Sequence, residues 1–311
     1  MDRGSFDALA TAFPGCVKVM ALSSLTTWRI GGEAAVIEAR SAGMLADILG
    51  RARELGVEVF LLGRGSNLLV SDDGYDGLVV RLAGDFGMVS WTRGGDGWLV
   101  SAGAAVTLPG LAGAACMKGA AGLEFAVGIP GSLGGAVFMN AGAYGGSMAD
   151  RVVSVEVLDG NGFRTMDRAA CGFGYRASSF QDSDALVLSV LLSLDSGDRD
   201  RLMESASATL RKRRESFPLD LPNAGSVFRR VEGAPPPGKL IEDAGLKGRR
   251  VGGAMISKLH ANFIVNAGGA SSSDVFGLIH DARRVVYDAS GVSLREEIRY
   301  LGSFEEPQRG R

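Results

Sequence analysis

Apolar side chains recur at helical spacing after Ser41, and one helix face collects Leu45, Ile48, Ala52 and Leu55. Ser41 can cap this helix and Gly56 can end it. The apolar run 57–62 then predicts a strand that leads into a glycine loop, and short alternating stretches predict further strands at 78–82, 98–102, 152–159 and 186–194. The pattern indicates an α+β domain that ends near Ser196.

The pattern changes beyond that point. A polar helix is predicted over 198–215, and Phe217-Pro218 stops it. A second unit is predicted over 217–291, with a proline-rich loop at 233–238 and a strand-like core within 256–266. Its long helix begins at the cap 271–274 and carries an apolar face made by Val275, Leu278, Ile279, Ala282, Val285, Val286 and Ala289.

The tail of the polar helix, residues 211–214, is the only dense basic run. One interpretation is a solvated last turn that complements the helix dipole. The other is that one of its arginines reaches a substrate phosphate across a domain boundary. The sequence leaves both open.

Charge and composition narrow the function classes. The 33 Lys and Arg against 35 Asp and Glu argue against a nucleic-acid binder that works through a general basic surface. Two uncharged stretches, 97–117 and 125–149, are long enough to cross a bilayer, but the second is rich in glycine and indicates buried loop and strand. With three cysteines, no C-x-x-C and no apolar leader, we expect a cytoplasmic protein.

Glycine is the outlier of the composition, with 46 residues in 311, and it concentrates in two loops at 63–67 and 128–135. Such loops turn several backbone N–H groups toward one point and remove the Cβ atoms that would block a pyrophosphate. Neither loop forms the three-glycine dinucleotide fingerprint or a P-loop. Each alone is commonly a simple turn, but the two together favour a buried dinucleotide.

Eight motifs in chain order then carry a family resemblance. They lie at 27–32, 63–70, 122–132, 139–146, 175–178, 224–228, 240–248 and 260–263. Together the motifs resemble the UDP-N-acetylenolpyruvoylglucosamine reductases, the MurB family, in their shorter form, over about residues 20–302.

The resemblance implies an α+β fold with a two-lobed FAD-binding domain of the vanillyl-alcohol-oxidase (PCMH) type and a C-terminal α+β substrate-binding domain. The expected division is an N-terminal segment 1–25, the FAD domain 26–196, a linking helix 197–216, the substrate domain 217–293 and a return segment 294–311 that brings its residues back to the flavin. Non-covalent FAD would be held by Gly63, Arg64, Gly65, Ser66, Asn67, Gly128, Ile129, Pro130, Gly131, Ser132 and Gly134.

The resemblance also implies a reaction. NADPH reduces the flavin, which passes a hydride to the enolpyruvyl ether of UDP-N-acetylglucosamine and so makes UDP-N-acetylmuramate for peptidoglycan. Ser226 would supply the proton, while Arg176 and Glu297 would stabilise the carbanionic intermediate. Without the family, Arg176 could be a surface ion pair, Ser226 a turn residue and Glu297 one acid among several.

The implied substrate contacts are Tyr175, Arg230, Lys247 and His260. Two positions depart from the family, because Arg230 stands where an asparagine is expected and Arg295 where the first glutamate of the C-terminal motif is expected. If 294–298 is extended, Glu296 and Glu297 point to opposite faces, and only one of them can reach the flavin site.

Two alternatives remain open: another FAD oxidase or dehydrogenase of the same fold, and a nucleotide-sugar binding protein that has lost catalysis. We expect no metal site, since two isolated histidines without cysteine or aspartate partners form no zinc site. We expect a monomer that binds neither nucleic acid nor a membrane.

Overall fold

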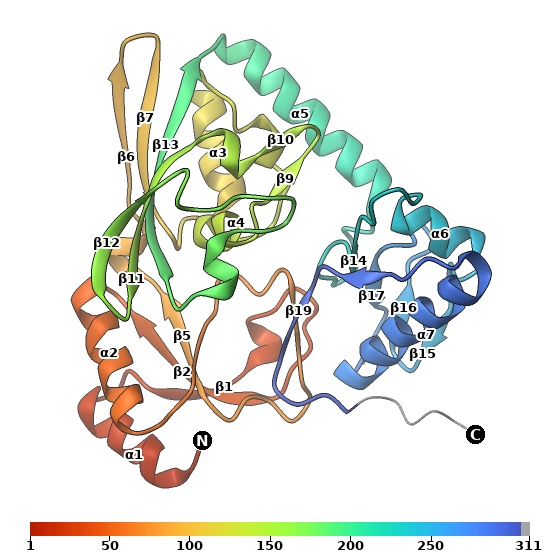
Figure 1. Ribbon diagram of the computed structural model, residues 1–311, viewed down its shortest axis with the longest axis horizontal. Helices are drawn as coiled ribbons and strands as arrows, with labels where there is room; N and C mark the ends of the chain where they lie inside the picture. The colour runs from red at the N-terminus through yellow and green to blue at the C-terminus, as the bar shows by residue number, and fades with distance from the viewer. Residues whose placement is uncertain (306–311) are drawn as a thin grey trace. The chain divides into compact units, whose positions relative to one another are not determined.

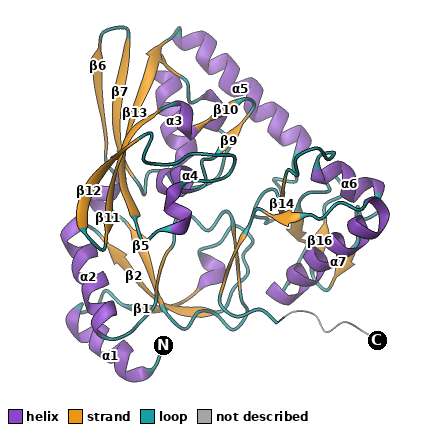
Figure 2. Ribbon diagram, viewed as in Figure 1, coloured by secondary structure: helices purple, strands orange, loops and turns teal. Residues whose placement is uncertain are grey.

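The computed structural model describes residues 1–305 and contains two compact units. Unit 1 consists of residues 1–36, 65–78 and the chain from 214 onward, and unit 2 consists of residues 37–64 and 79–213. Figures 1 and 2 show the elements of both units. The chain passes between the units several times, so neither unit is a single continuous stretch.

Unit 2 is built on an antiparallel sheet of six strands in the order β12-β11-β13-β7-β6, with β8 also paired to β13. Helix α4 packs against β13 and β7 (Figure 1). The elements assigned mainly to this unit are α2 (Ala42–Glu54), β3 (Val59–Leu61), β5 (Leu78–Leu82), β6 (Val89–Gly94), β7 (Gly97–Gly103), α3 (Leu108–Met117), β8 (Ala120–Ala121), α4 (Leu133–Phe138), β9 (Gly142–Ala143), β10 (Gly146–Ser147), β11 (Val152–Asp159), β12 (Gly162–Asp167), β13 (Leu186–Ser196) and α5 (Arg199–Ser216).

The core of unit 2 follows from the alternation of its strands. On β13 the apolar residues Val190, Leu192 and Leu194 are buried, and they meet the buried face of β7 and the helices α3 and α4. The helix expected after Ser41 is confirmed as α2, because the Ser41 Oγ accepts a hydrogen bond from the Met44 N–H at 3.2 Å. The strands expected at 78–82 and 152–159 are confirmed with the same bounds, as β5 and β11.

Unit 1 combines the N-terminal residues with the C-terminal third of the chain. Its three-stranded antiparallel sheet has the order β15-β16-β17, and helix α7 packs against β15 and β16. Its elements are α1 (Arg3–Ala12), β1 (Lys18–Ala21), β2 (Glu33–Ala39), β4 (Leu68–Val70), β14 (Phe228–Arg229), α6 (Pro237–Asp243), β15 (Arg250–Val251), β16 (Ala254–Ile256), β17 (Ile264–Asn266), α7 (Ser272–Ser290), β18 (Arg295–Glu296) and β19 (Arg299–Leu301).

A separate sheet of four strands has the order β1-β2-β5-β3, and within it β1 and β2 are antiparallel. Short 3₁₀ turns connect the larger elements, at η1 (Leu22–Ser24), η2 (Gly84–Gly87), η3 (Glu124–Ala126), η4 (Met148–Asp150) and η5 (Ser179–Asp182).

Trp28 joins the N-terminal residues to the core of unit 1. Its side chain is fully buried, and its indole N–H donates to the Ile264 carbonyl at 2.7 Å. The Asn266 amide in turn donates to the Trp28 carbonyl at 3.1 Å. Leu69 from β4 lies in the same core, beside apolar residues of α7 such as Leu278. Residues about 200 positions apart therefore share one core.

The long C-terminal helix forms as its capping pattern predicts. The Ser271 Oγ accepts from the Asp274 N–H at 3.0 Å, while the Asp274 carboxylate accepts from the Ser271 N–H at 3.0 Å, and Gly291 ends α7 in the left-handed conformation. The strand-like core expected within 256–266 is two short strands, β16 and β17, with a turn between them. The intervening Ser257 caps that turn by accepting from the Leu259 N–H at 3.1 Å.

Candidate active site

The first glycine loop, 63–67, follows directly on β3. Gly65 has φ +59°, and a Cβ at this position would collide with the Leu25 carbonyl oxygen. The Gly65 carbonyl accepts a hydrogen bond from the Thr27 N–H at 3.1 Å. A side chain at position 65 would push the loop away from residues 25–27, so glycine is required here.

The second glycine loop meets the first at Ser132. A Cβ built on Gly63 would lie 2.7 Å from the Ser132 Oγ, which also caps α4 by accepting from the Gly135 N–H at 3.3 Å. Ser132 is buried, and the Gly131 carbonyl accepts from the Leu108 N–H at 3.0 Å. Two loops almost 70 residues apart in sequence are thus in direct contact within unit 2.

The donor chemistry of these loops fits a dinucleotide. Neither 63–67 nor 128–135 contains an acidic residue, and both offer backbone N–H groups and serine hydroxyls to an anion. The Ser132 hydroxyl lies where a Cβ on Gly63 would be, so glycine at position 63 allows the two loops to approach each other. Of the predicted FAD residues, the structure brings Gly63 and Ser132 together, while Gly65, Ser66 and Asn67 belong to unit 1.

The basic end of α5 divides into two kinds of residue. Arg211, Lys212 and Arg214 are exposed, as a solvated last turn requires, but Arg213 is partly buried. Its side chain occupies the position that a Cβ on Gly128 would need. Burial lowers the pKa of Arg213, and an interaction with Tyr144 opposes that shift. Arg213 is therefore part of the glycine-loop region of unit 2, and a contact with a substrate phosphate stays a prediction.

Ser226 and Glu297 lie on neighbouring chain segments in unit 1. Strands β14 and β18 pair antiparallel, with Phe228 opposite Glu296, and the Glu297 N–H donates to the Val227 carbonyl at 2.7 Å. The residue after Ser226 is therefore hydrogen-bonded to Glu297 itself. Val227 and Glu297 are 70 positions apart in the sequence, yet their backbones are in direct contact.

The same segment also reaches the first glycine loop. The Asn67 side-chain amide donates to the Glu297 carbonyl at 3.0 Å, and the Arg299 N–H donates to the Asn67 carbonyl at 3.0 Å. Beyond this point β19 runs parallel to β4, with Arg299 opposite Leu68. Glu297 is consequently held between the Ser226 strand and the last residue of the predicted flavin loop.

A buried asparagine that the sequence reasoning did not single out fixes the Ser226 strand. The Asn262 carboxamide accepts from the Phe228 N–H at 3.0 Å and donates to the Phe228 carbonyl at 2.8 Å. Its backbone carbonyl accepts from the Val227 N–H at 2.8 Å. Asn262 thus makes the backbone hydrogen bonds that a neighbouring strand would make. Its place in the motif 260–263 was the sequence signal that could have identified it.

The two adjacent glutamates have different surroundings. The Glu296 carboxylate forms an ion pair with Arg283 of α7 at 3.1 Å. Glu296 shares its strand face with the buried residues Leu294 and Ile298, whereas Glu297 falls on the opposite face. Which of the two glutamates reaches the site, and the catalytic role of Glu297, stay predictions.

Arg176 lies in unit 2, at the tip of a two-residue turn between Gly174 and Ala177. Its backbone adopts φ +54°, and its guanidinium carbon lies 5.5 Å from the centroid of the Tyr175 ring. Tyr175 is 57% exposed. The structure therefore places the two predicted residues of this motif together, in a different unit from Ser226 and Glu297.

The other predicted substrate residues belong to unit 1. His260 packs against the rings of Phe217 and Phe263, with centroid distances of 5.3 and 5.1 Å. Burial, and next the charge of Lys247, lower the pKa of His260. Lys247 also forms a 2.8 Å ion pair with Glu242. His260 and Lys247 are thus neighbours.

Arg230, the remaining predicted substrate residue, is exposed just after β14. Within residues 1–305 no group of three or more His, Cys, Asp or Glu side chains is placed to hold a metal ion. No helix in that same range has the length and apolarity needed to cross a membrane.

Comparisons with known proteins cover nearly the whole chain. Residues 217–301 match the model of the UDP-N-acetylenolpyruvoylglucosamine reductase C-terminal domain, and residues 33–165 match an FAD binding domain. These matches confirm the predicted fold class, an FAD-binding domain with a C-terminal MurB domain.

Relatives of this chain carry the name of the same family. The UDP-N-acetylenolpyruvoylglucosamine reductase of Heliobacterium modesticaldum is 45% identical over 90% of this chain and 89% of its own, and that of Caldicellulosiruptor bescii is 42% identical over 92% and 90%. The crystal structure of the reductase from Thermus caldophilus superposes with a TM-score of 0.78 at 35% identity, covering 92% of this chain and 99% of that one.

Proposed function

Because the chain belongs to the UDP-N-acetylenolpyruvoylglucosamine reductase family, we propose that Ser226, Glu297 and Arg176 perform that family's chemistry here. The chain is an FAD- and NADPH-dependent oxidoreductase, a UDP-N-acetylmuramate dehydrogenase of peptidoglycan biosynthesis. It reduces the enolpyruvyl ether of UDP-N-acetylglucosamine to the lactyl ether. When bound, FAD supplies the hydride that NADPH provides.

The reaction places two demands on the protein. Hydride addition to the terminal methylene carbon moves the double-bond electrons to the adjacent carbon, next to a carboxylate. Fixed positive charge and hydrogen-bond donors must stabilise that electron density, and an acid must protonate the carbon. We assign the fixed positive charge to Arg176 and a further stabilising role to the carboxyl group of Glu297, as the family resemblance implies.

Ser226 is the proposed proton donor. A hydroxyl is a weak acid, but a carbanionic carbon is basic enough to take its proton, and solvent then restores the hydroxyl. The observation that carries this assignment is the backbone contact between Val227 and Glu297 at 2.7 Å. This contact supports the proposal because Ser226 immediately precedes Val227, and because the Asn262 side chain hydrogen-bonds both backbone groups of Phe228 in the same segment.

The remaining assignments are part of the same proposal. Loops 63–67 and 128–134 hold FAD without a covalent bond, and Tyr175, Arg230, Lys247 and His260 contact the nucleotide sugar. The chain works in the cytoplasm, a location supported by its three free thiols. The balanced charge supports a protein without a nucleic-acid partner, and the expectation of a monomer stays a prediction.

Substitution of Ser226 tests the proposal by separating the half-reactions. We expect Ser226→Ala to leave flavin reduction by NADPH within about twofold and to slow re-oxidation by substrate by roughly 10²–10⁴-fold, the usual contribution of general acid catalysis. Stopped-flow absorbance of the flavin measures both rates. The control is Ser293→Ala, an exposed serine of the same unit. Equal slowing of both half-reactions would contradict the role as proton donor.

A further inference from the structure

The turn that carries Arg176 requires support from outside itself. Gly174 and Ala177 exchange backbone hydrogen bonds at 3.0 and 3.3 Å, which leaves only Tyr175 and Arg176 to reverse the chain. Arg176 adopts φ +54°, a conformation that side chains with a Cβ rarely take. Because this conformation is unfavourable for arginine, the surrounding residues must maintain it.

Gln181 supplies the most direct support. Its side-chain amide donates to the Arg176 carbonyl at 3.0 Å and to the Phe138 carbonyl at 2.9 Å. A primary amide has two N–H donors in a fixed plane, so both are used by these two contacts. The Arg176 peptide is thereby tied to the last residue of α4, which is an element independent of the turn.

The other end of the turn is anchored to the same place. The Asn140 side-chain amide donates to the Gly174 carbonyl at 2.8 Å, and its oxygen accepts from the Ala149 N–H at 2.9 Å. The Ser178 hydroxyl donates to the Phe138 carbonyl at 2.6 Å. Both carbonyls that flank the tip are therefore bound by side chains that are fixed at the end of α4.

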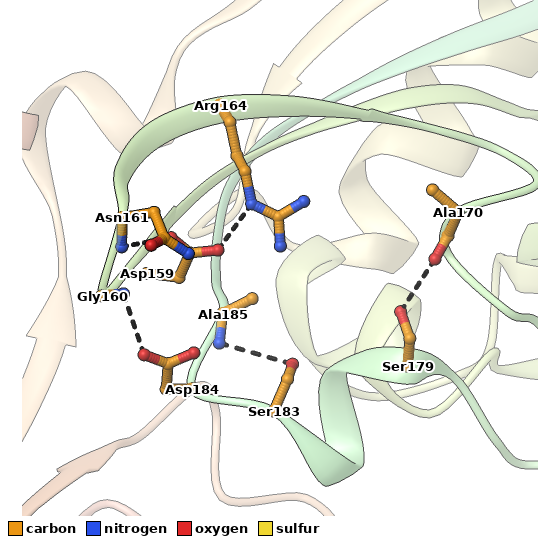
Figure 3. Close-up of polar contacts among 9 residues, drawn as sticks. All are labelled: Asp159, Gly160, Asn161, Arg164, Ala170, Ser179, Ser183, Asp184 and Ala185. Carbon is orange, nitrogen blue, oxygen red and sulfur yellow. Dashed lines mark hydrogen bonds and ion pairs between the residues drawn. The ribbon is translucent and has the colours of Figure 1, made fainter.

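The base of the segment has its own attachments, which do not involve Arg176. Figure 3 shows the Ser179 hydroxyl donating to the Ala170 carbonyl at 3.1 Å, and the Asp184 carboxylate accepting from the Gly160 N–H at 2.8 Å. With the base held in this way, loss of the Gln181 amide would release the tip alone. Loss of the Gln181 amide would therefore mainly change the direction in which the Arg176 guanidinium points.

We propose that Gln181 is a positioning residue for Arg176, which it serves by holding the left-handed backbone of Arg176 against α4. The inference rests on the proposed role of Arg176 in substrate reduction. A catalytic cation must be held within a fraction of an ångström of its working position, and a displacement of about 1 Å can cost about 100-fold in rate. Gln181 therefore acts on the reaction without touching the substrate.

A double-mutant cycle on the FAD-loaded enzyme tests the proposal. Gln181→Leu removes both donors at similar size, and we expect it to slow flavin re-oxidation by substrate about 10- to 100-fold, with reduction by NADPH within twofold. In an Arg176→Ala background, adding Gln181→Leu should change the re-oxidation rate less than twofold. Gln181→Met repeats the test should the leucine variant fold poorly, and Ser179→Ala is the matched control at the base of the segment.

A second readout does not depend on turnover. Trypsin cleaves after arginine, and a released turn opens more often than a held one. We expect cleavage after Arg176 to accelerate at least several-fold in Gln181→Leu and to stay unchanged in Ser179→Ala.

The possible failures are distinguishable. If Arg176→Ala reduces substrate at the wild-type rate, the proposed role of Arg176 fails, and the positioning role falls with it. If Arg176→Ala is slow but Gln181→Leu is as fast as wild type, only the positioning role is overturned. An equal effect of Gln181→Leu with and without Arg176 would also overturn it, because the effect would then come from general structure.

Discussion

The pair Glu296 and Glu297 offers the sharpest test of the site, because adjacent residues of identical chemistry have different surroundings. The change is glutamate to glutamine at each position in turn. It keeps the size of the side chain and most of its hydrogen-bonding capacity, and it removes the titratable group. Neither variant alters the backbone contacts of Glu297 with Val227 and Asn67. Both should therefore fold and retain FAD.

The structure sets the expected magnitudes. Glu296→Gln removes the charge from an ion pair with Arg283 at 3.1 Å, in which the two side chains are 21% and 46% exposed. Such solvent-screened pairs contribute about 0–1 kcal/mol to stability. Glu297→Gln removes the acid proposed to stabilise the intermediate, and we expect at least a 100-fold loss. That factor corresponds to about 2.7 kcal/mol of transition-state free energy.

The assay is single-turnover re-oxidation. Each variant is reduced by NADPH without oxygen, separated from the excess and mixed with substrate while the flavin absorbance is followed. We expect a slow trace for Glu297→Gln and a wild-type trace for Glu296→Gln, with melting temperatures recorded for both. The reverse order of damage would refute the assignment, and equal damage to both would indicate that the segment serves packing.

The remaining predictions concern the cofactor loops and pH. Gly63→Ala should weaken FAD binding about tenfold or more, because its Cβ would lie 2.7 Å from the Ser132 Oγ and overpacking costs roughly 1–3 kcal/mol. Flavin titration measures the affinity. The control is Gly113→Ala, whose Cβ meets no atom within 4 Å and which should bind FAD normally. Burial first, and then Lys247, lower the pKa of His260 in the folded state. Stability is therefore greatest above the unfolded pKa of about 6.5 and is lost as the pH falls through that value toward the folded pKa. His260→Gln should lose less melting temperature between pH 7 and pH 5 than wild type, and an identical pH profile would contradict this reasoning.

Elements whose signals are local could be predicted from the sequence. Ser41 and Gly56 mark the ends of α2, and the Ser271–Asp274 capping box starts α7, because caps depend on residues three or four positions apart. The run of apolar residues at 78–82 and the apolar pattern of 152–159 likewise indicated β5 and β11. The family motifs also supplied the identities of Ser226, Arg176 and Glu297, residue by residue.

The contacts among those residues were decided by tertiary structure. That the Glu297 backbone meets Val227 and Asn67 depends on parallel pairing of β19 with β4, some 230 residues earlier, and no local pattern encodes a pairing across that distance. The burial of Trp28 against Ile264 has the same origin. Every residue except proline carries the same backbone donor and acceptor, so a strand's partner is selected by the packing of the whole core and not by the strand's own sequence.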